Sequence, residues 1–218
     1  MVETSDGGYA IAGETNSFDG LWLVKTDVNG NMIWNRTYSE GSVWDTCSLV
    51  VTSDGGFAIA GDSGGAGFAD FWLIKTDNQG NMDWSRTYGG TSNDHANSLI
   101  QTSDGGYAIA GVTYSFDAGQ GDFWLVKIDV DGNMMWSSTY GGMGPDYGYS
   151  LVQTYDEGYV IAGVTGSFGA EGANFWLIKT DEYGIVPEYS SWVLLSIMLV
   201  ATFVIVIYKK RLNNTSIP

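Results

Sequence analysis

The chain has 218 residues and a formal net charge of −16, with 31 glycines, 9 tryptophans and 13 tyrosines. This mixture favours many short strands joined by tight turns, and its aromatic content excludes a disordered polar chain. The acidic charge excludes nucleic acid as a partner, because the phosphates would be repelled. The single cysteine, Cys47, excludes an intrachain disulfide and is expected to be a small buried hydrophobic residue.

One phrase runs through the chain from its start, since "TSDGGYAIAG" and close variants of it occur four times. The aspartates of the four copies are Asp6, Asp54, Asp104 and Asp156, and the tryptophans that follow them are Trp22, Trp72, Trp124 and Trp176. Length varies only between each aspartate and its tryptophan, so the rest of the unit is a fixed scaffold. The sequence is therefore an array of units of about 50 residues.

Each full unit predicts four antiparallel strands, which in the third copy cover residues 98–102, 107–113, 123–129 and 134–140. The third of these strands is apolar on both faces, as a sheet that is covered on both sides requires. The fold class is therefore all-β, a β-propeller of four-stranded antiparallel blades. An open solenoid of stacked sheets is the alternative. The recurring Trp34, Trp84 and Trp136 favour the propeller, because each can wedge between two blades.

The expected blades cover residues 1–47, 48–97, 98–149 and 150–184. The first copy is expected to lack its first strand and the fourth its last, which gives 14 strands. Unpaired strands at both ends would be open edges. We therefore expect the chain to be part of a larger or incomplete ring, either the C-terminal part of a longer propeller or a protein whose true start lies upstream.

The variable segment joins the second and third strands of each unit, on the same side as the connections between units. Length variation on a fixed scaffold is typical of a binding face. Acidic and aromatic residues alternate there, which suits sugars or cations. The candidate ligand-binding residues are Asp19, Trp44, Asp70, Asp94, Tyr114, Asp117, Asp122 and Asp146. The alternative is that the carboxylates only solvate a surface and the aromatic rings pack at its rim.

The second tight turn of the units, "DVNGN", "DNQGN" or "DVDGN", is similar to the start of a calcium loop but lacks the later glutamate. A plain turn is favoured, so no cofactor and no metal are expected, with Ca²⁺ as the alternative. The only histidine, His95, occurs in one copy beside Asp94, with no nucleophile next to it. It is expected to be a surface residue, and no catalytic residue or enzyme activity is expected.

After a linker at 185–191, residues 192–208 form an apolar stretch without a charge, which is long enough for one transmembrane helix. The residues expected to anchor it are Trp192, Tyr208, Lys209, Lys210 and Arg211. Aromatic rings at both edges and a basic cluster at the end are typical of a membrane span with a cytoplasmic C-terminus, here 209–218. The repeats would then lie outside the cell, although the first residues do not read as an export signal. A buried core helix is the alternative.

The phrase "LVKTDVNGNMIW" resembles the blade motif of pyrroloquinoline-quinone-type propeller repeats, and the whole unit is similar to propeller repeats of archaeal and bacterial cell-surface proteins. The stretch "VPEYSSWVLLSIMLVATFVIVIYKKR" is similar to a Pro-Glu-Phe-type C-terminal sorting signal, with Tyr189 in place of the phenylalanine. The first resemblance covers residues 1–184 and implies a propeller. It implies no quinone site, because only the structural motif is shared.

These features predict a membrane-anchored cell-surface propeller that serves as a binding or adhesion module through its acidic, aromatic face. The expected partners are membrane lipid through the C-terminal helix, and a glycan, a cation or a surface protein at the binding face. A spacer of a surface layer without a ligand is one alternative. An exported quinoprotein-type oxidoreductase is the other.

Overall fold

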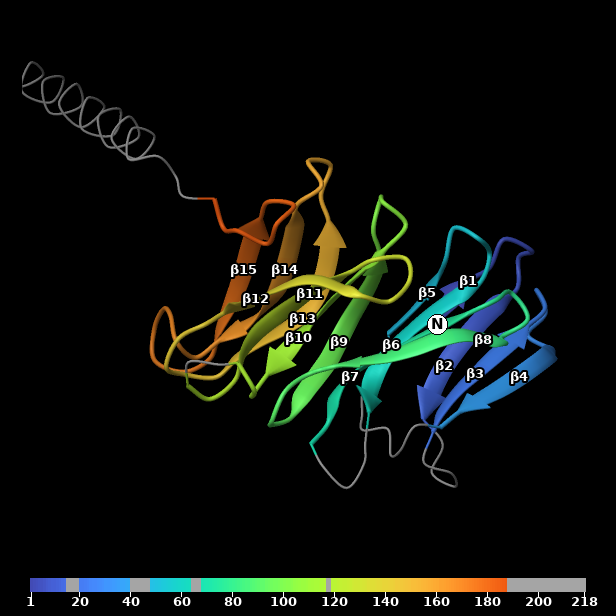
Figure 1. The fold of residues 1–218 in the computed structure, drawn as a ribbon, viewed down its shortest axis with the longest axis horizontal. Coiled ribbons are helices and arrows are strands. Elements are labelled where there is room, and N and C mark those ends of the chain that lie inside the picture. Colours follow the sequence, from blue (N-terminus) through green and yellow to red (C-terminus); the bar gives the residue numbers. More distant parts are fainter. Residues whose placement is uncertain (15–19, 40–47, 64–67, 117–118, 188–218) are drawn as a thin grey trace, which may run out of the picture. The chain divides into compact units, whose positions relative to one another are not determined.

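The computed structural model describes residues 1–14, 20–39, 48–63, 68–116 and 119–187 of the chain. Met1–Ile185 form one compact unit, and within its described residues every regular element is a β-strand (Figure 1). The 15 strands form four antiparallel sheets, one for each copy of the repeat. The expectation of an all-β, propeller-like repeat is confirmed at this level.

The strands follow one another in each sheet in chain order. The first sheet contains β1 (Val2–Glu3), β2 (Tyr9–Glu14), β3 (Leu21–Thr26) and β4 (Met32–Tyr38), and the second β5 (Ser48–Val51), β6 (Phe57–Ser63), β7 (Asp70–Thr76) and β8 (Met82–Tyr88). The third contains β9 (Asp94–Gln101), β10 (Tyr107–Thr113), β11 (Asp122–Ile128) and β12 (Met134–Tyr140), and the fourth β13 (Asp146–Gln153), β14 (Tyr159–Thr165) and β15 (Asn174–Thr180).

The strand count corrects one expectation. The first sheet has a first strand, β1, which pairs Val2 with Ala10 and Glu3 with Tyr9. The turn after it closes through hydrogen bonds from Thr4 N to Gly8 O and from Gly7 N to Thr4 O, both 2.9 Å. Two residues are enough for a strand here, because the adjacent tight turn fixes the register.

The first strands β5, β9 and β13 contact one another and so form the inner edge of the sheets. Hydroxyl groups join them, since Ser48 Oγ accepts a hydrogen bond from Leu99 N at 3.0 Å and Ser98 Oγ accepts one from Leu151 N at 3.1 Å. The first strands of the third and fourth sheets begin at Asp94 and Asp146, inside the segments expected to connect the sheets.

A lysine closes each sheet on the side of the tight turns, and it is buried in the first three sheets and half-buried in the fourth. The turn aspartates Asp6, Asp54, Asp104 and Asp156 form ion pairs with Lys25, Lys75, Lys127 and Lys179 at 2.8–2.9 Å. In the third sheet the ammonium of Lys127, 5% exposed, also donates to Ile128 O. The lysine thereby ties the turn between the first two strands to the third strand, and a buried ammonium requires such partners.

The pKa of the turn aspartates follows from these contacts. Partial burial opposes ionisation of Asp104, but hydrogen bonds from Lys127, Thr102 and the Gly106 N–H outweigh it and lower the pKa to about 2. Hydrogen bonds from Thr154 and Lys179 likewise lower the pKa of Asp156 to about 2. These carboxylates are therefore ionised throughout the physiological range.

A tryptophan on the last strand of each of the first three sheets packs against the next sheet, as expected. The rings of Trp34, Trp84 and Trp136 meet Phe57, Tyr107 and Tyr159 edge-on, with centroids 5.8–5.9 Å apart. A tyrosine four residues later adds a polar contact, since Tyr38 Oη donates to Gly80 O at 2.7 Å and Tyr88 Oη to Gly132 O at 2.9 Å. The tight turn between the last two strands of one sheet thus lies under the tryptophan of the preceding sheet.

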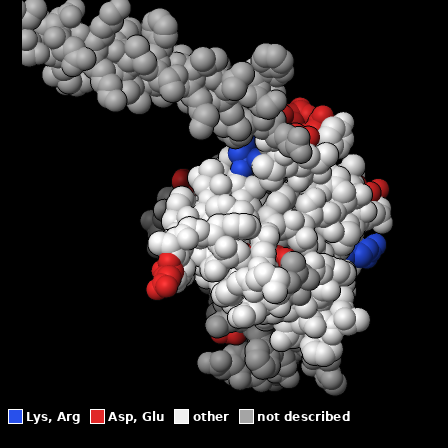
Figure 2. Space-filling model, turned by 90° about the vertical axis from the view of Figure 1, so that its left-hand side faces the viewer, with Lys and Arg blue, Asp and Glu red and all other residues white. Residues whose placement is uncertain are grey.

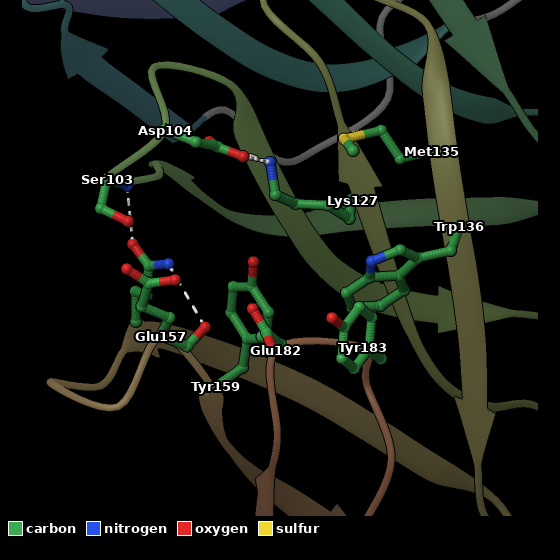
Figure 3. A pocket seen from close by; sticks show the side chains of 10 residues that line it. Ser103, Asp104, Lys127, Met135, Trp136, Glu157, Tyr159, Glu182 and Tyr183 are labelled. Carbon is green, nitrogen blue, oxygen red and sulfur yellow. Dashed lines mark hydrogen bonds and ion pairs between the residues drawn. The ribbon is translucent and has the colours of Figure 1, made fainter.

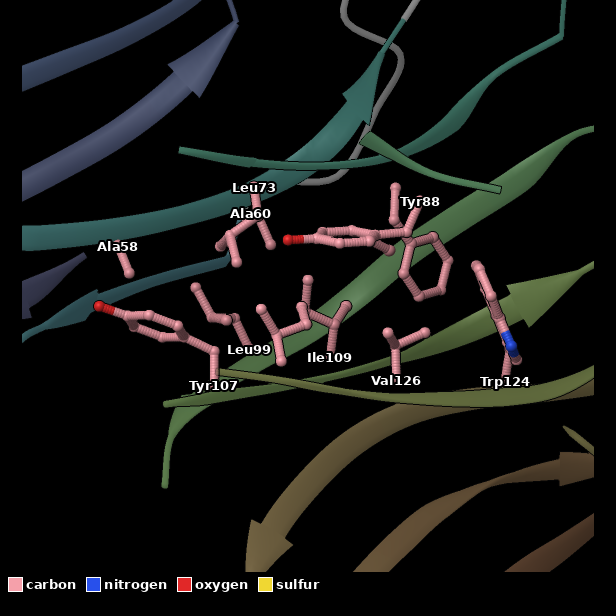
Figure 4. Close-up of a cluster of buried hydrophobic side chains, with 12 residues drawn as sticks. Ala58, Ala60, Leu73, Tyr88, Leu99, Tyr107, Ile109, Trp124 and Val126 are labelled. Carbon is pink, nitrogen blue, oxygen red and sulfur yellow. The ribbon is translucent and has the colours of Figure 1, made fainter. Parts of the chain in front are cut away.

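Apolar side chains fill the space between neighbouring sheets. Between the second and third sheets, Leu73 and Phe71 face Ile109, Val126 and Trp124, all of them buried (Figure 4). Equivalent clusters lie between the first and second sheets and between the third and fourth. The core therefore consists of layers between sheets, which explains why central strands are apolar on both faces.

Among the described residues, no helix is long and apolar enough to cross a membrane. The expected span at 192–208 and its anchoring residues lie outside them, as does the basic tail.

Two glycines of the second sheet provide a matched test of the tryptophan packing. Both have a positive φ, +75° at Gly80 and +83° at Gly55, but only at Gly80 would a Cβ meet the Trp34 ring, at 2.7 Å. Both Gly→Ala substitutions should cost about 1 kcal/mol for the backbone conformation. Gly80→Ala should cost a further ~2 kcal/mol for the clash. Urea unfolding measures this difference, which should become smaller when Trp34 is also changed to Ala, because the contact with Arg36 Cγ at 2.9 Å remains.

The lysine pair predicts acid sensitivity. Asp104→Asn removes the charge opposite the buried ammonium and should lower stability at pH 7 by about 2 kcal/mol, less than for a fully buried pair because Asp104 is half-exposed. A carboxyl whose pKa is lowered on folding stabilises the fold above its unfolded pKa of about 3.9 and stops doing so as the pH falls through about 2. The loss of stability between pH 4 and 2 should therefore be smaller in Asp104→Asn. Asp131→Asn, in an exposed turn of the same sheet, should behave like the wild type.

Candidate functional site

We call the side that carries the tight turns the turn face. The opposite side is the loop face, made of the connections between second and third strands and those between sheets. The described segments of the loop face are 68–69, 89–93, 114–116, 119–121, 141–145 and 166–173. Those expected binding residues that the structure describes belong to the loop face or to the strand ends beneath it.

Two of the expected ligand-binding carboxylates, Asp94 and Asp146, are fully buried. Asp94 accepts hydrogen bonds from Thr113 Oγ1 at 2.5 Å and Ser115 Oγ at 2.7 Å. Asp146 accepts one from Ser167 Oγ at 2.6 Å. Their carboxylates hold the loops that follow β10 and β14, and a ligand-binding role for the two residues stays a prediction.

Asp70 and Asp122 begin the third strands of their sheets and lie against the glycines that follow the neighbouring strands β8 and β12. A Cβ at Gly89 would lie 1.9 Å from Asp70 Oδ1, and one at Gly141 2.0 Å from Asp122 Oδ1. Burial and the nearby charge of Asp94 raise the pKa of Asp70, against a hydrogen bond from Gly90. Asp122 is buried. Asp70 is half-buried, and each of the two carboxylates lies close to the first aspartate of the next sheet, Asp94 or Asp146.

Tyr114 is the expected binding residue that the structure places in a polar surface cluster. Its hydroxyl lies 3.2 Å from that of Tyr147, and its ring lies edge-on to the imidazole of His95, with centroids 6.3 Å apart. His95 Nδ1 is 2.7 Å from Asp62 Oδ2, and Asp62 Oδ1 accepts a hydrogen bond from Ala96 N at 2.8 Å. We call Asp62, His95, Tyr114 and Tyr147 the tyrosine–histidine cluster.

The cluster is assembled from three sheets. Asp62 is the penultimate residue of β6, and Tyr114 follows β10. His95 and Tyr147 are the second residues of β9 and β13. The cluster therefore lies where the first and second strands meet the loop face. A sequence pattern does not identify His95 and Tyr147 as site residues. Each occurs in only one copy of the repeat, and the residues that they contact in space are distant in sequence. Their position one residue after the recurring Asp94 and Asp146 is the signal that could have found them.

Asp62 controls the charge of the imidazole. Its hydrogen bond raises the pKa of His95, while partial burial of the ring opposes the increase. Asp62 itself is buried, whereas His95 is partly accessible. The cluster therefore offers a protonatable ring and two phenolic hydroxyls, which can donate and accept hydrogen bonds, beside aromatic faces.

Three exposed phenylalanines belong to the described segments of the loop face, Phe68, Phe116 and Phe168. Phe116 lies on Trp124 with centroids 5.4 Å apart, and Phe168 lies on Trp176 at 5.1 Å. The rings of Phe116 and Phe168 are thus held in place by tryptophans, so the apolar surface that these two rings offer is fixed by packing.

Three of the expected binding residues, Asp19, Trp44 and Asp117, lie outside the described residues. Among those that are described, no three His, Cys, Asp or Glu side chains gather as a metal site would require. The aspartates of the calcium-like turns are engaged locally. Asp27 Oδ1 accepts hydrogen bonds from Asn29 N and Asn31 N at 2.9 and 2.8 Å, which is the role of a turn residue.

The turn face has a pocket of about 160 Å³ between the third and fourth sheets. Trp136 and Tyr159 form its apolar wall, and the Asp104–Lys127 pair lies at its edge (Figure 3). Gln153 closes one side, because its Oε1 accepts a hydrogen bond from Ser103 N at 2.8 Å. The polar groups of this pocket mostly satisfy one another, so it is a groove of the packing between sheets.

No protein-family model matches the sequence, and a comparison with curated proteins finds no match. Solved structures with a similar arrangement include a bifunctional GH43-CE protein of Bacteroides eggerthii, at a TM-score of 0.48 and 15% identity over 84% of this chain. An α-L-arabinofuranosidase of Clostridium thermocellum gives 0.44 and 10% over 84%, and a DUF4221 member of Bacteroides vulgatus gives 0.41 and 10% over 81%.

The chain spans 24% of the first of these structures, 71% of the second and 65% of the third. At these TM-scores the likenesses carry no statement about activity. What the chain's own strands define is an all-β protein of repeated antiparallel sheets with a propeller-like arrangement.

The single histidine makes the Asp62 contact directly measurable. Asp62→Asn keeps the shape but removes the charge, so the pKa of His95 should fall towards its ordinary value of about 6.5. NMR titration of the one imidazole gives both values.

A pKa raised on folding means that the pair stabilises the fold fully below about pH 6.5 and loses this contribution as the pH rises through the folded pKa. Asp62→Asn should remove that part of the pH dependence, whereas Glu171→Gln, an exposed carboxyl of the same face, should keep it. An unchanged His95 titration in Asp62→Asn would contradict the assignment.

Proposed function

We propose that the chain is a binding module whose loop face recognises a neutral glycan at the tyrosine–histidine cluster. The observation that carries the proposal is the pair of hydroxyls from Tyr114 and Tyr147, 3.2 Å apart, beside the His95–Asp62 pair and drawn from different sheets. Hydroxyl and imidazole groups at such spacing can donate and accept hydrogen bonds with sugar hydroxyls.

Supported aromatic rings add the apolar part of such a site. Ligand sites combine apolar and aromatic surface with a few placed polar groups. Phe116 provides exposed ring surface close in sequence to Tyr114, and Trp124 beneath it holds the ring in place. A neutral ligand suits this face better than an anion, because the net charge of the chain is −16.

The proposal includes display at the cell surface. The uncharged stretch at 192–208 would form a single span, with Trp192 and Tyr208 at its edges and Lys209, Lys210 and Arg211 in the cytoplasm. The similarity of the repeats to pyrroloquinoline-quinone-type surface propellers, and of the C-terminal segment to a sorting signal, supports the same placement. A module outside the cell would have access to glycans of neighbouring surfaces.

Aromatic substitutions test this function. The probes are neutral hexasaccharides of glucose, mannose and xylose, with binding to the full chain measured by calorimetry. For a hexasaccharide that binds, Tyr114→Ala should weaken the affinity at least about tenfold through lost ring contact and hydrogen bonding, and Tyr147→Phe about threefold through the lost hydroxyl.

Tyr155→Ala is the matched control, because this tyrosine is fully exposed in a turn of the opposite face. It should bind like the wild type. Absence of binding to all three hexasaccharides at millimolar concentration would overturn the glycan proposal and leave a spacer role. Equal effects of the Tyr114 and Tyr155 substitutions would place the site elsewhere.

A further inference from the structure

The fourth sheet leaves one of its faces uncovered. Phe175 and Leu177 of β15 are 74% and 53% exposed, although their counterparts in the third sheet, Phe123 and Leu125, are completely buried. The pairing of β14 with β15 places Val164 opposite Phe175 and Ala162 opposite Leu177 on this same face. We call these four residues the trailing face. In the third sheet, the equivalent face is covered by the fourth sheet.

The first sheet leaves the opposite face uncovered. Ile11 and Trp22 are 41% and 40% exposed, whereas Ile109 and Trp124 at the same positions of the third sheet are 0% and 1% exposed. Strand pairing places Val24 opposite Ile11. We call Tyr9, Ile11, Trp22 and Val24 the leading face. In the second and third sheets, the leading face is buried by the preceding sheet.

The two uncovered faces are complementary, because each internal junction joins a trailing face to a leading face. At these junctions Phe71 packs on Trp124 with centroids 4.6 Å apart, and Phe123 packs on Trp176 at 4.9 Å. The next pair in this series is Phe175 with Trp22. Large uncovered apolar faces of this kind mark interaction sites.

Charge does not oppose such a contact. Viewed from the side of β15, most of the described surface carries neither acidic nor basic side chains (Figure 2). Lys179, the charged residue that neighbours Leu177 on this face, is already paired with Asp156 at 2.9 Å. The trailing face can therefore be covered without leaving an unpaired charge.

We propose that two copies of this chain associate head to tail, with the trailing face of each copy on the leading face of the other. Continuity with the internal junctions carries the inference, since the same residue types recur in the same register. A head-to-tail contact closes into a ring when its rotation permits. Two copies with four sheets each would give eight, which is within the range of propellers.

This junction would rest on the first three strands of the fourth sheet. At an internal junction, a tryptophan of the last strand also packs on the next sheet, as Trp136 packs on Tyr159. The described residues of the fourth sheet form three strands only and do not provide this contact. The contact between copies should therefore be weaker than an internal junction and depend on protein concentration.

Two single substitutions and their mixture test the arrangement. Leu177→Asp disrupts only the trailing face and Ile11→Asp only the leading face. Both residues are exposed, so the sheets should remain folded, which circular dichroism checks. The full chain is measured by analytical ultracentrifugation in density-matched neutral detergent. The wild type should sediment as a dimer, with twice the 23.5 kDa mass of one chain. The dimer of each variant alone should have a dissociation constant at least about tenfold higher than that of the wild type.

The mixture is decisive, because one intact trailing face and one intact leading face remain in it. When differently tagged Leu177→Asp and Ile11→Asp chains are mixed, they should form a heterodimer at concentrations at which each variant alone is monomeric. Val130→Asp, in an exposed turn outside both faces, should dimerise like the wild type. A monomeric wild type, a mixture without heterodimers, or dimers of either variant that match the wild type would overturn the proposal.

Discussion

The structure depends on one lysine ammonium in each sheet, which is buried in the first three sheets and half-buried in the fourth. The ammonium of Lys127 lies beside the first tight turn of its sheet, where it forms an ion pair with Asp104 and donates a hydrogen bond to Ile128 O. This contact leaves no room for a side chain at the second glycine of the turn, because a Cβ at Gly106 would lie 2.3 Å from Ile128 O and 2.9 Å from Lys127 Nζ. The recurring phrase "SDGG" and the lysine that follows about 20 residues later are thus two parts of one interaction. Its closure sets the register of the first three strands and places the apolar residues on their faces.

Once each sheet is closed, the junctions follow from side chains of fixed spacing. Trp84 and Tyr88 leave the last strand of one sheet and meet Tyr107 and Gly132 of the next. On the other side, buried carboxylates such as Asp94 hold the loops that follow the second strands. The acidic character of the sequence therefore has two physical meanings. Some carboxylates are structural partners within and between sheets, and others only solvate the surface.

The same rigidity explains how a surface site can arise from residues that do not repeat. The first and second strands bring Asp62, His95, Tyr114 and Tyr147 to one end of three sheets, while the scaffold below them remains constant. Variation at the partly exposed Tyr114 and Tyr147 does not disturb the buried layers, so chemistry can change there without changing the fold. Binding at the loop face and association through the end faces are therefore compatible proposals, because they use different surfaces.

The sequence by itself determined the repeat, the four-stranded sheets, the tight turns and the role of the tryptophans on the last strands. These features are local or periodic, and each copy confirms the others. Only the tertiary structure decided which carboxylates are accessible, because burial of Asp94 and Asp146 depends on loops and sheets that are distant in sequence. Likewise, the His95–Tyr114–Tyr147 grouping and the two uncovered end faces arise from contacts between sheets. A periodic pattern specifies each sheet, but the surroundings of a single residue depend on what the neighbouring sheet places against it.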